Sequence, residues 1–98
     1  MTQLQRLTLA DSVTVSSDVV FRTLDGEAVL LRLDTGTYYG LEPVGTRIWE
    51  LIIEHGSLRG VLDAMLREFD VDAARLESDV VRLAAELCAN GLATVSAR

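Results

Sequence analysis

The strongest indication of the fold is DVVFRTLDGEAVLLRLDTGTYYGL, which spans residues 18–41. Two turns, Thr23-Leu24-Asp25-Gly26-Glu27 and Leu33-Asp34-Thr35-Gly36-Thr37, separate its apolar runs, and each has glycine as the last residue of its loop. Glycine at the end of such a turn is typical of a three-residue hairpin loop, in which it takes a left-handed conformation beside a bulge. The stretch therefore predicts a three-stranded antiparallel meander, with strands at about 18–24, 27–34 and 37–41.

Three-residue loops also predict how the strands pair. They place Phe21 opposite Val29, Val19 opposite Leu31, Leu31 opposite Tyr39 and Val29 opposite Leu41. All of these apolar residues then share one face with Leu33, as a sheet with one buried side requires. A two-residue turn at Asp25-Gly26 would put Arg22 opposite Val29 and mix the faces, so we expect the first register. Val13 and Val15 are candidates to extend the meander at its start.

Residues 42–98 predict three helices, which gives the chain an α+β order. Pro43 suits the first turn of a helix, where its missing N–H costs nothing. Ser57 and Asp72 are candidate N-caps of the second and third helices, and the third helix ends at Asn90 with a glycine after it. We expect strands at about 13–41, helices at about 43–90 and a single domain over residues 1–98.

The third expected helix has an apolar arc wider than burial on one side requires. Its core stripe consists of Leu76, Val80, Leu83 and Leu87, and smaller or shorter residues extend the arc to one side: Ala74, Val81, Ala85 and Cys88. At 100° per residue the arc spans roughly 200°, against about 100° for a one-sided helix. Small residues let another backbone approach closely, so this flank is a candidate wall of a groove. The alternative is that alanines are simply good helix formers.

The composition narrows the function. The chain has 15 acidic and 9 basic residues, all nine of them arginine, and a net charge of −6. A nucleic-acid binder needs a basic face that releases counterions from phosphates, so this charge argues against DNA or RNA. No apolar run approaches the roughly 18 residues of a membrane span, and the N-terminus lacks the apolar core of a signal peptide. A single cysteine excludes an internal disulfide and fits a reducing cytoplasm.

Groups that could perform catalysis are scarce. The one histidine, His55, precedes Gly56 at the end of a helix, where it would interact with the helix dipole. Cys88 lies on an apolar arc, and no histidine is near it in the sequence. The chain contains no nucleophile elbow, glycine-rich phosphate loop or metal-binding cluster. We therefore expect a binding module that is not an enzyme and needs no cofactor or metal.

The last strand of the expected meander is an edge strand that carries Tyr38-Tyr39. An exposed apolar edge is a liability unless another chain pairs with it, and extended peptides use such edges for strand addition. In the expected register Tyr39 faces the helices and Tyr38 faces the other side. The backbone of residues 37–41 would supply hydrogen bonds to an added strand.

Three segments together resemble the PqqD-like family: the stretch at 18–41, VGTRIWEL at 44–51 and SDVVRLAAELCANGLATV at 78–95. The resemblance covers roughly residues 10–95. It implies a winged-helix-like RiPP recognition element, which binds the leader peptide of a ribosomally made precursor against its third strand and third helix. The tyrosine strand and Ile48-Trp49 look most like the stand-alone leader-binding proteins of lasso peptide pathways. Glu42 departs from the pattern, which would have asparagine there.

The strand and the helix together form the expected peptide-binding site. Its candidate residues are Thr37, Tyr38, Tyr39, Gly40, Leu41, Ala74, Arg75, Asp79, Val81, Arg82, Ala85 and Cys88. The expected partners are the precursor leader peptide and a modifying enzyme, a leader peptidase or cyclase, and the protein would be a monomer or weak dimer. One alternative is a PqqD-type chaperone for a radical enzyme in quinone cofactor or other RiPP synthesis. A winged-helix DNA-binding protein is a second alternative, which the charge opposes. A carrier protein is a third, and it would need an attachment serine at a helix start.

Overall fold

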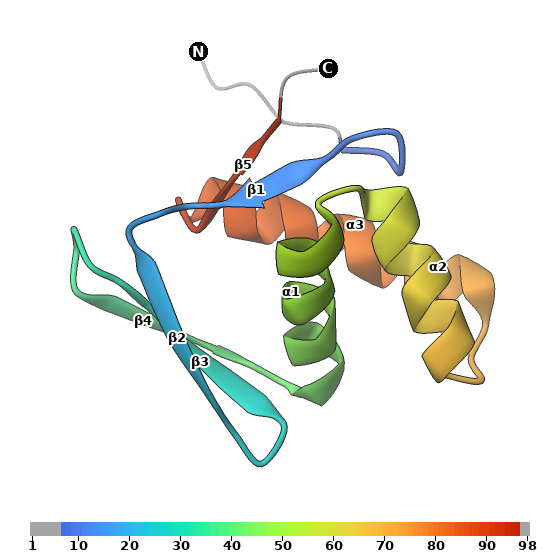
Figure 1. The fold of residues 1–98 in the computed structure, drawn as a ribbon, viewed down its shortest axis with the longest axis horizontal. Helices are drawn as coiled ribbons and strands as arrows, with labels where there is room; N and C mark the ends of the chain where they lie inside the picture. Colours follow the sequence, from blue (N-terminus) through green and yellow to red (C-terminus); the bar gives the residue numbers. More distant parts are fainter. Residues whose placement is uncertain (1–6, 97–98) are drawn as a thin grey trace.

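The computed structural model describes residues 7–96 (Figure 1). Four strands come first, then three helices and a final short strand. They are β1 (Val13–Val15), β2 (Val19–Leu24), β3 (Glu27–Arg32), β4 (Thr37–Leu41), α1 (Pro43–His55), α2 (Leu58–Glu68), α3 (Ala73–Ala89) and β5 (Ala93–Val95). The expected α+β arrangement, a three-stranded antiparallel sheet followed by three helices, is confirmed.

The expected register of the meander is wrong by one residue. Phe21 pairs with Leu30, which in turn pairs with Tyr39. The first turn has only two central residues, Asp25 and Gly26, with φ angles of 53° and 78°. Two residues with positive φ form a hairpin turn whose twist matches that of the strands, so no bulge is needed.

This shift changes which side chains the sheet buries. Ala28 and Leu30 are 1% and 0% exposed, whereas Val29 is 44% exposed. Val29 and Leu31, expected inside, therefore lie on the outer face of the sheet. Tyr39 still faces the helices and packs against the core, as expected, and Tyr38 is 68% exposed.

The strand β1 does not extend the meander. Val13 and Val15 pair with Val95 and Ala93 of β5 in a separate two-stranded sheet. The chain reaches β5 because Gly91, with φ 74°, reverses it after α3, and the Leu92 amide then donates to the Leu87 carbonyl at 2.9 Å. This reversal is the expected helix stop, but the strand that follows it was not expected.

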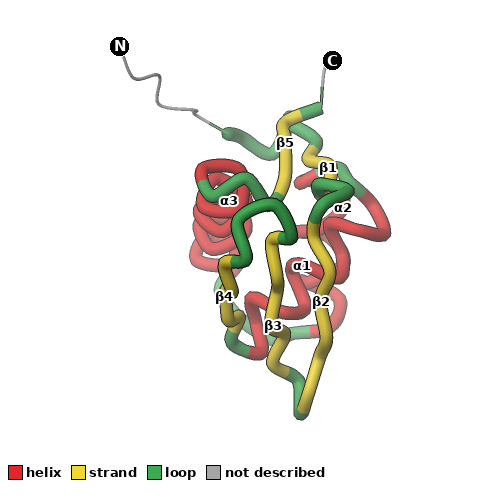
Figure 2. The backbone as a smooth tube through the Cα atoms, turned by 90° about the vertical axis from the view of Figure 1, so that its left-hand side faces the viewer, coloured by secondary structure: helices red, strands yellow, loops and turns green. Residues whose placement is uncertain are grey.

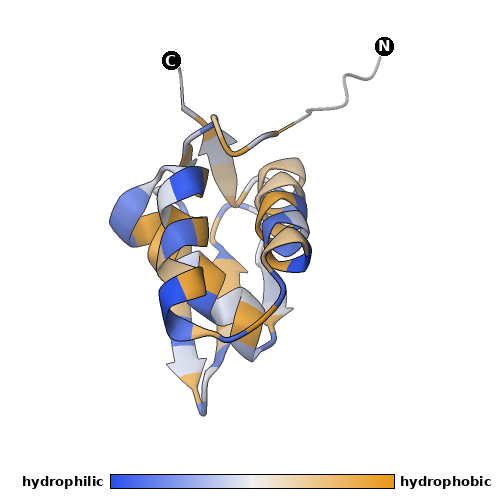
Figure 3. Ribbon diagram, turned by 90° about the vertical axis from the view of Figure 1, so that its right-hand side faces the viewer, coloured by the Kyte–Doolittle hydropathy of each residue, from blue (hydrophilic) through white to orange (hydrophobic). Residues whose placement is uncertain are grey.

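Side chains cap the N-termini of two of the three helices, α2 and α3. The Ser57 side chain accepts a hydrogen bond from the Gly60 amide, and that of Asp72 accepts one from the Arg75 amide. Glu42, at the start of α1, makes no such bond. Figure 3 shows hydrophilic and hydrophobic residues on different sides of the helices, and their hydrophobic sides meet in the core.

The core joins the meander to the helices around Trp49. Its side chain is 0% exposed, and its ring packs edge-on against Phe21 of β2, with 5.5 Å between centroids. Ile48, Ile52 and Leu30 are buried beside it in the same cluster. The inner face of the sheet therefore rests on α1, which fixes the position of the meander relative to the helices.

Candidate functional site

The strand β4 is an edge of the meander. The order of strands is β2-β3-β4, so within residues 7–96 β4 pairs with β3 alone. Figure 2 shows β4 on the side of the sheet that lies toward α3. The backbone of β4 therefore has one side available for hydrogen bonds with another extended chain.

A buried threonine of α1 holds the end of β4 in place. The Thr46 hydroxyl accepts a hydrogen bond from the Ala28 amide at 2.8 Å and donates one to the Leu41 carbonyl at 3.2 Å. Thr46 is only 3% exposed. It ties β3, β4 and α1 together through one oxygen atom, and the sequence patterns did not single it out. A polar residue on the inward side of a helix is the signal that would have found it.

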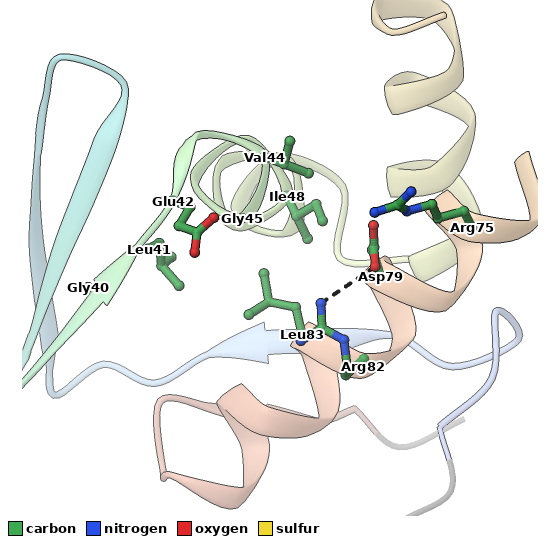
Figure 4. Close-up of a pocket in the computed structure, with 10 residues that line it drawn as sticks. All are labelled: Gly40, Leu41, Glu42, Val44, Gly45, Ile48, Arg75, Asp79, Arg82 and Leu83. Atoms are coloured by element: carbon green, nitrogen blue, oxygen red, sulfur yellow. Dashed lines mark hydrogen bonds and ion pairs between the residues drawn. The ribbon is translucent and has the colours of Figure 1, made fainter. Parts of the chain in front are cut away.

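A pocket of about 420 Å³ lies beside the end of β4 (Figure 4). We call it the strand pocket. Residues of three elements line it, together with Glu42, which lies between β4 and α1. They are Gly40 and Leu41 of β4, Val44, Gly45 and Ile48 of α1, and Arg75, Asp79, Arg82 and Leu83 of α3. Five of the candidate residues meet there: Gly40, Leu41, Arg75, Asp79 and Arg82.

The sequence analysis missed the contribution of α1 to this pocket. Gly45 leaves space there, since a Cβ atom at this position would lie 3.6 Å from the Leu83 side chain and 3.8 Å from that of Leu41. A glycine inside a helix is unfavourable relative to alanine, which is the signal that could have marked the position.

The wall that α3 turns toward the strand pocket is the charged arc, not the arc of small residues. Arg75, Asp79 and Arg82 recur at helical spacing and line the pocket together. Ala74 and Val81 instead line a different pocket, together with Leu7 and Thr8 of the N-terminal segment.

Two further residues of the small arc, Ala85 and Cys88, are half-buried against the core. Burial raises the pKa of the Cys88 thiol, which disfavours the reactive thiolate. Much of the expected apolar flank of α3 therefore contacts parts of the chain other than β4. Thr37, Tyr38 and Tyr39 lie along β4 before the strand pocket begins.

The two arginines on the α3 wall differ in their ion pairs. Arg82 forms ion pairs with Asp79 at 3.5 Å and with Glu86 at 3.3 Å. Arg75 makes no ion pair with another residue in the range 7–96, and Figure 4 shows its side chain near Asp79, reaching toward α1. The wall thus has a row of paired charges around Arg82, with Arg75 near the Asp79 carboxylate but outside ion-pair distance at its N-terminal end.

No cluster of three metal-binding side chains occurs in the part of the chain that the structure describes. Among the same residues, no helix is long and apolar enough to cross a membrane. His55, at the end of α1, is exposed and lies 3.5 Å from the Glu54 carboxylate. The features that stand out are therefore the free strand edge and the pocket at its end.

Comparison with known proteins gives one family and two similar structures. The family model described as coenzyme PQQ synthesis protein D (PqqD) matches residues 27–93. The structure "TbiB1 in complex with the TbiA(β) leader peptide" is 38% identical, with a TM-score of 0.78, over 87% of this chain and 99% of that chain. The structure "Lasso peptide synthetase B1 complexed with the leader peptide" has a TM-score of 0.74 over 84% and 96% of the two chains; at 23% identity it shows a shared fold. No curated protein matches the sequence.

Proposed function

The chain belongs to the PqqD family, and on that premise we propose that it is a RiPP recognition element that binds the leader peptide of a ribosomally synthesised precursor. The free edge of β4, with a pocket at its end, carries the proposal. The similar structure at 38% identity is a complex with a leader peptide, which supports a peptide as the ligand. The protein would act by binding, without catalysing a reaction itself.

Binding would take place by strand addition to β4. The leader would pair with the backbone of residues 37–41, and alternate side chains would point toward α3 or toward solvent. Gly40 and Leu41 would guide one leader side chain into the strand pocket, whose apolar part is formed by Leu41, Ile48 and Leu83. Backbone hydrogen bonds would supply much of the affinity and the pocket would supply specificity.

A modifying enzyme, a leader peptidase or cyclase of a lasso peptide pathway, would be the second partner. The outer face of the sheet suits it, because Val20, Leu31 and Tyr38 form a cross-strand row there. Val20 and Tyr38 are 48% and 68% exposed. An added leader strand would widen this face, so enzyme and leader would meet at one composite sheet. Ribosomal precursors are made in the cytoplasm, and we place the protein there as a monomer or weak dimer.

Two other functions receive less support. A chaperone that serves a radical enzyme would use the same strand edge, and only the identity of the partner enzyme separates it from the lasso function. A winged-helix DNA-binding protein would need a basic helix. Here Asp79 and Glu86 neutralise Arg82 on α3, and the chain as a whole has a net charge of −6.

Peptide titration tests the proposal. The probes are fluorescein-labelled TbiA(β) leader peptide and the leader of the precursor encoded nearest to this chain's gene, measured by fluorescence anisotropy. We expect micromolar or tighter binding of at least one of them, with slower amide hydrogen exchange in residues 37–41 of the complex. Absence of binding by both peptides at tens of micromolar contradicts the proposal.

The enzyme-docking surface is tested separately. We expect Val20→Asp to leave leader affinity within about twofold, since Val20 lies on β2, at the edge of the sheet opposite β4, and to slow leader cleavage by the peptidase encoded with the precursor. Ile53→Asp, at a residue of α1 that is 49% exposed, is the matched control. Equal cleavage rates for the two variants would place the enzyme elsewhere.

A further inference from the structure

The outer face of the meander has a gap on its edge strand. Tyr38 and Gly40 are the outward-facing residues of β4, because Tyr39 and Leu41 turn to the helices and pack against the core. Tyr38 has a large, exposed side chain and Gly40 has none. A Cβ atom added at Gly40 would have no other atom within 4 Å. The outer face of β4 therefore presents one bulky residue and, beside it, a bare stretch of backbone.

A pocket of about 200 Å³ lies at this gap, and we call it the glycine notch. It opens on the outer face, since Val29 is exposed and pairs directly with Gly40, whereas the side chain of Ala28 is buried. The strand pocket lies on the other face, toward α1 and α3. The lining of the glycine notch consists of Glu27, Ala28, Val29, Gly40, Leu41 and Glu42.

A strand added to β4 would place its side chains alternately on the two faces of the sheet. Those on the helix side would lie between β4 and α3, and the others would continue the outer face. The leader residue directly opposite Gly40 belongs to the second group. Its side chain would meet no side chain of Gly40 and could lie over the backbone there, with Tyr38 as its diagonal neighbour on the same face.

An aromatic ring suits this place. It is large enough to cover the backbone of a glycine at the edge of a sheet, and it can reach a diagonal neighbour, which a short side chain does not. The charges around the notch are mixed, with Glu27 and Glu42 at one end and Arg22 across from Val29. Shape rather than charge therefore distinguishes the glycine notch from the rest of the outer face.

On the premise of the proposed function, we propose that the glycine notch fixes the register of the leader strand: the leader residue opposite Gly40 points away from α3 and carries an aromatic side chain that covers the notch. A slip by one residue would turn this side chain to the helix side. A slip by two would place it opposite Tyr38 or beyond Leu41, where β4 ends. Backbone pairing by itself selects poorly among such registers, so the notch supplies the selection.

Peptides selected from a random mRNA-displayed library on the wild-type protein are the probes, so that no leader sequence is chosen in advance. Slower amide hydrogen exchange in residues 37–41 identifies the peptides that pair with β4. Each aromatic residue of one such peptide is then replaced by alanine, and affinities for the wild-type protein and for Gly40→Asp are compared. The variant suits the backbone, because the φ angle of Gly40 is not positive, and it places a charged side chain in the notch.

We expect one aromatic residue whose replacement weakens binding to the wild-type protein by about threefold to tenfold, and binding to Gly40→Asp by less than about twofold. Aromatic residues on the helix side should show equal losses in both proteins. Gly40→Ser, with a smaller and uncharged side chain, should show the same dependence to a lesser degree. Val20→Asp, which adds the same charge to the outer face at the opposite edge of the sheet, should behave as the wild type.

The outcomes separate this inference from the proposed function. Peptides that pair with β4 but contain no aromatic residue whose contribution depends on Gly40 overturn the inference and leave the proposed function standing. The same holds if Lys or Arg is the residue whose contribution depends on Gly40. No enrichment at all, or enrichment without slower exchange in residues 37–41, overturns both.

Discussion

Replacing Thr46 by valine removes one oxygen atom from the junction of β3, β4 and α1 and changes the shape of the side chain very little. The Ala28 amide donates to this oxygen at 2.8 Å, and in the variant it would be buried without an acceptor. An unsatisfied buried donor costs about 1–3 kcal/mol, and the lost hydrogen bond to the Leu41 carbonyl adds about 1 kcal/mol. We therefore expect the free energy of unfolding to fall by about 3 kcal/mol.

The measurement is urea unfolding followed by the fluorescence of Trp49, the one tryptophan of the chain. Its burial against Phe21 makes it sensitive to separation of the sheet from α1. For a chain of this size the loss corresponds to a Tm lower by roughly 10–25 °C. Leader affinity should fall as well, because the end of β4 would no longer be held against α1. Thr46→Ser keeps the hydroxyl and should retain most of the affinity.

Thr23→Val is the matched control, since Thr23 is an exposed residue of β2 and should change stability by no more than about 0.5 kcal/mol. The reasoning is refuted if Thr46→Val unfolds at the same urea concentration as Thr23→Val. An unchanged stability with a lower leader affinity would show that the hydroxyl contacts the peptide rather than the strands.

Three further predictions concern the helices. Gly45→Ala should raise the stability of α1 by up to about 1 kcal/mol but weaken leader binding, because its methyl group would enter the strand pocket. The control, Gly60→Ala in α2, should raise stability without weakening leader binding. Equal leader affinities of the two variants in peptide titration would contradict this role of Gly45. Hydrogen bonds from Arg47 lower the pKa of Glu68 and connect α1 to α2. This contribution to stability is present above the ordinary glutamate pKa of 4.5 and is lost as the pH falls through the lowered pKa of Glu68. Glu68→Gln should therefore flatten the acid limb of a curve of stability against pH. An unchanged acid limb would refute a stabilising role of the pair between Arg47 and Glu68. Burial raises the pKa of the Cys88 thiol, so iodoacetamide at pH 7 should label it faster after unfolding in urea, and equal rates would show that the thiol is already accessible.

The register of the meander shows where sequence reasoning failed and why. Both faces of β3 are apolar, with Ala28 and Leu30 on one and Val29 and Leu31 on the other. Alternation therefore could not choose the buried face. The choice depends on α1, because Ala28 is small enough to lie against the helix and donate to Thr46, while Leu30 packs among the buried residues around Trp49.

The candidate site was predicted in part. The edge strand with its two tyrosines followed from the order of turns and apolar runs, which are local signals. Arg75, Asp79 and Arg82 of the pocket wall were also expected at the site, but the small apolar residues expected beside them do not line this pocket. Helical periodicity tells which residues of α3 share a side but not what that side faces. Rotation of α3 about its axis is set by tertiary packing, which directs Ala74 and Val81 to the N-terminal segment and Arg75 to the pocket beside β4.

Local patterns in the chain were enough to predict the three strands of the meander, the three helices and the edge position of β4, since turns, caps and apolar periodicity act over a few residues. Composition alone gave the net charge of −6 and the absence of lysine, which argue against a nucleic-acid ligand. Packing of the folded chain selected the buried face of the sheet, connected the strands to α1 through Thr46, and brought charged residues of α3 beside the free edge. These features depend on contacts between residues far apart in the chain, where the fit of one surface to another selects among arrangements that the local patterns allow equally.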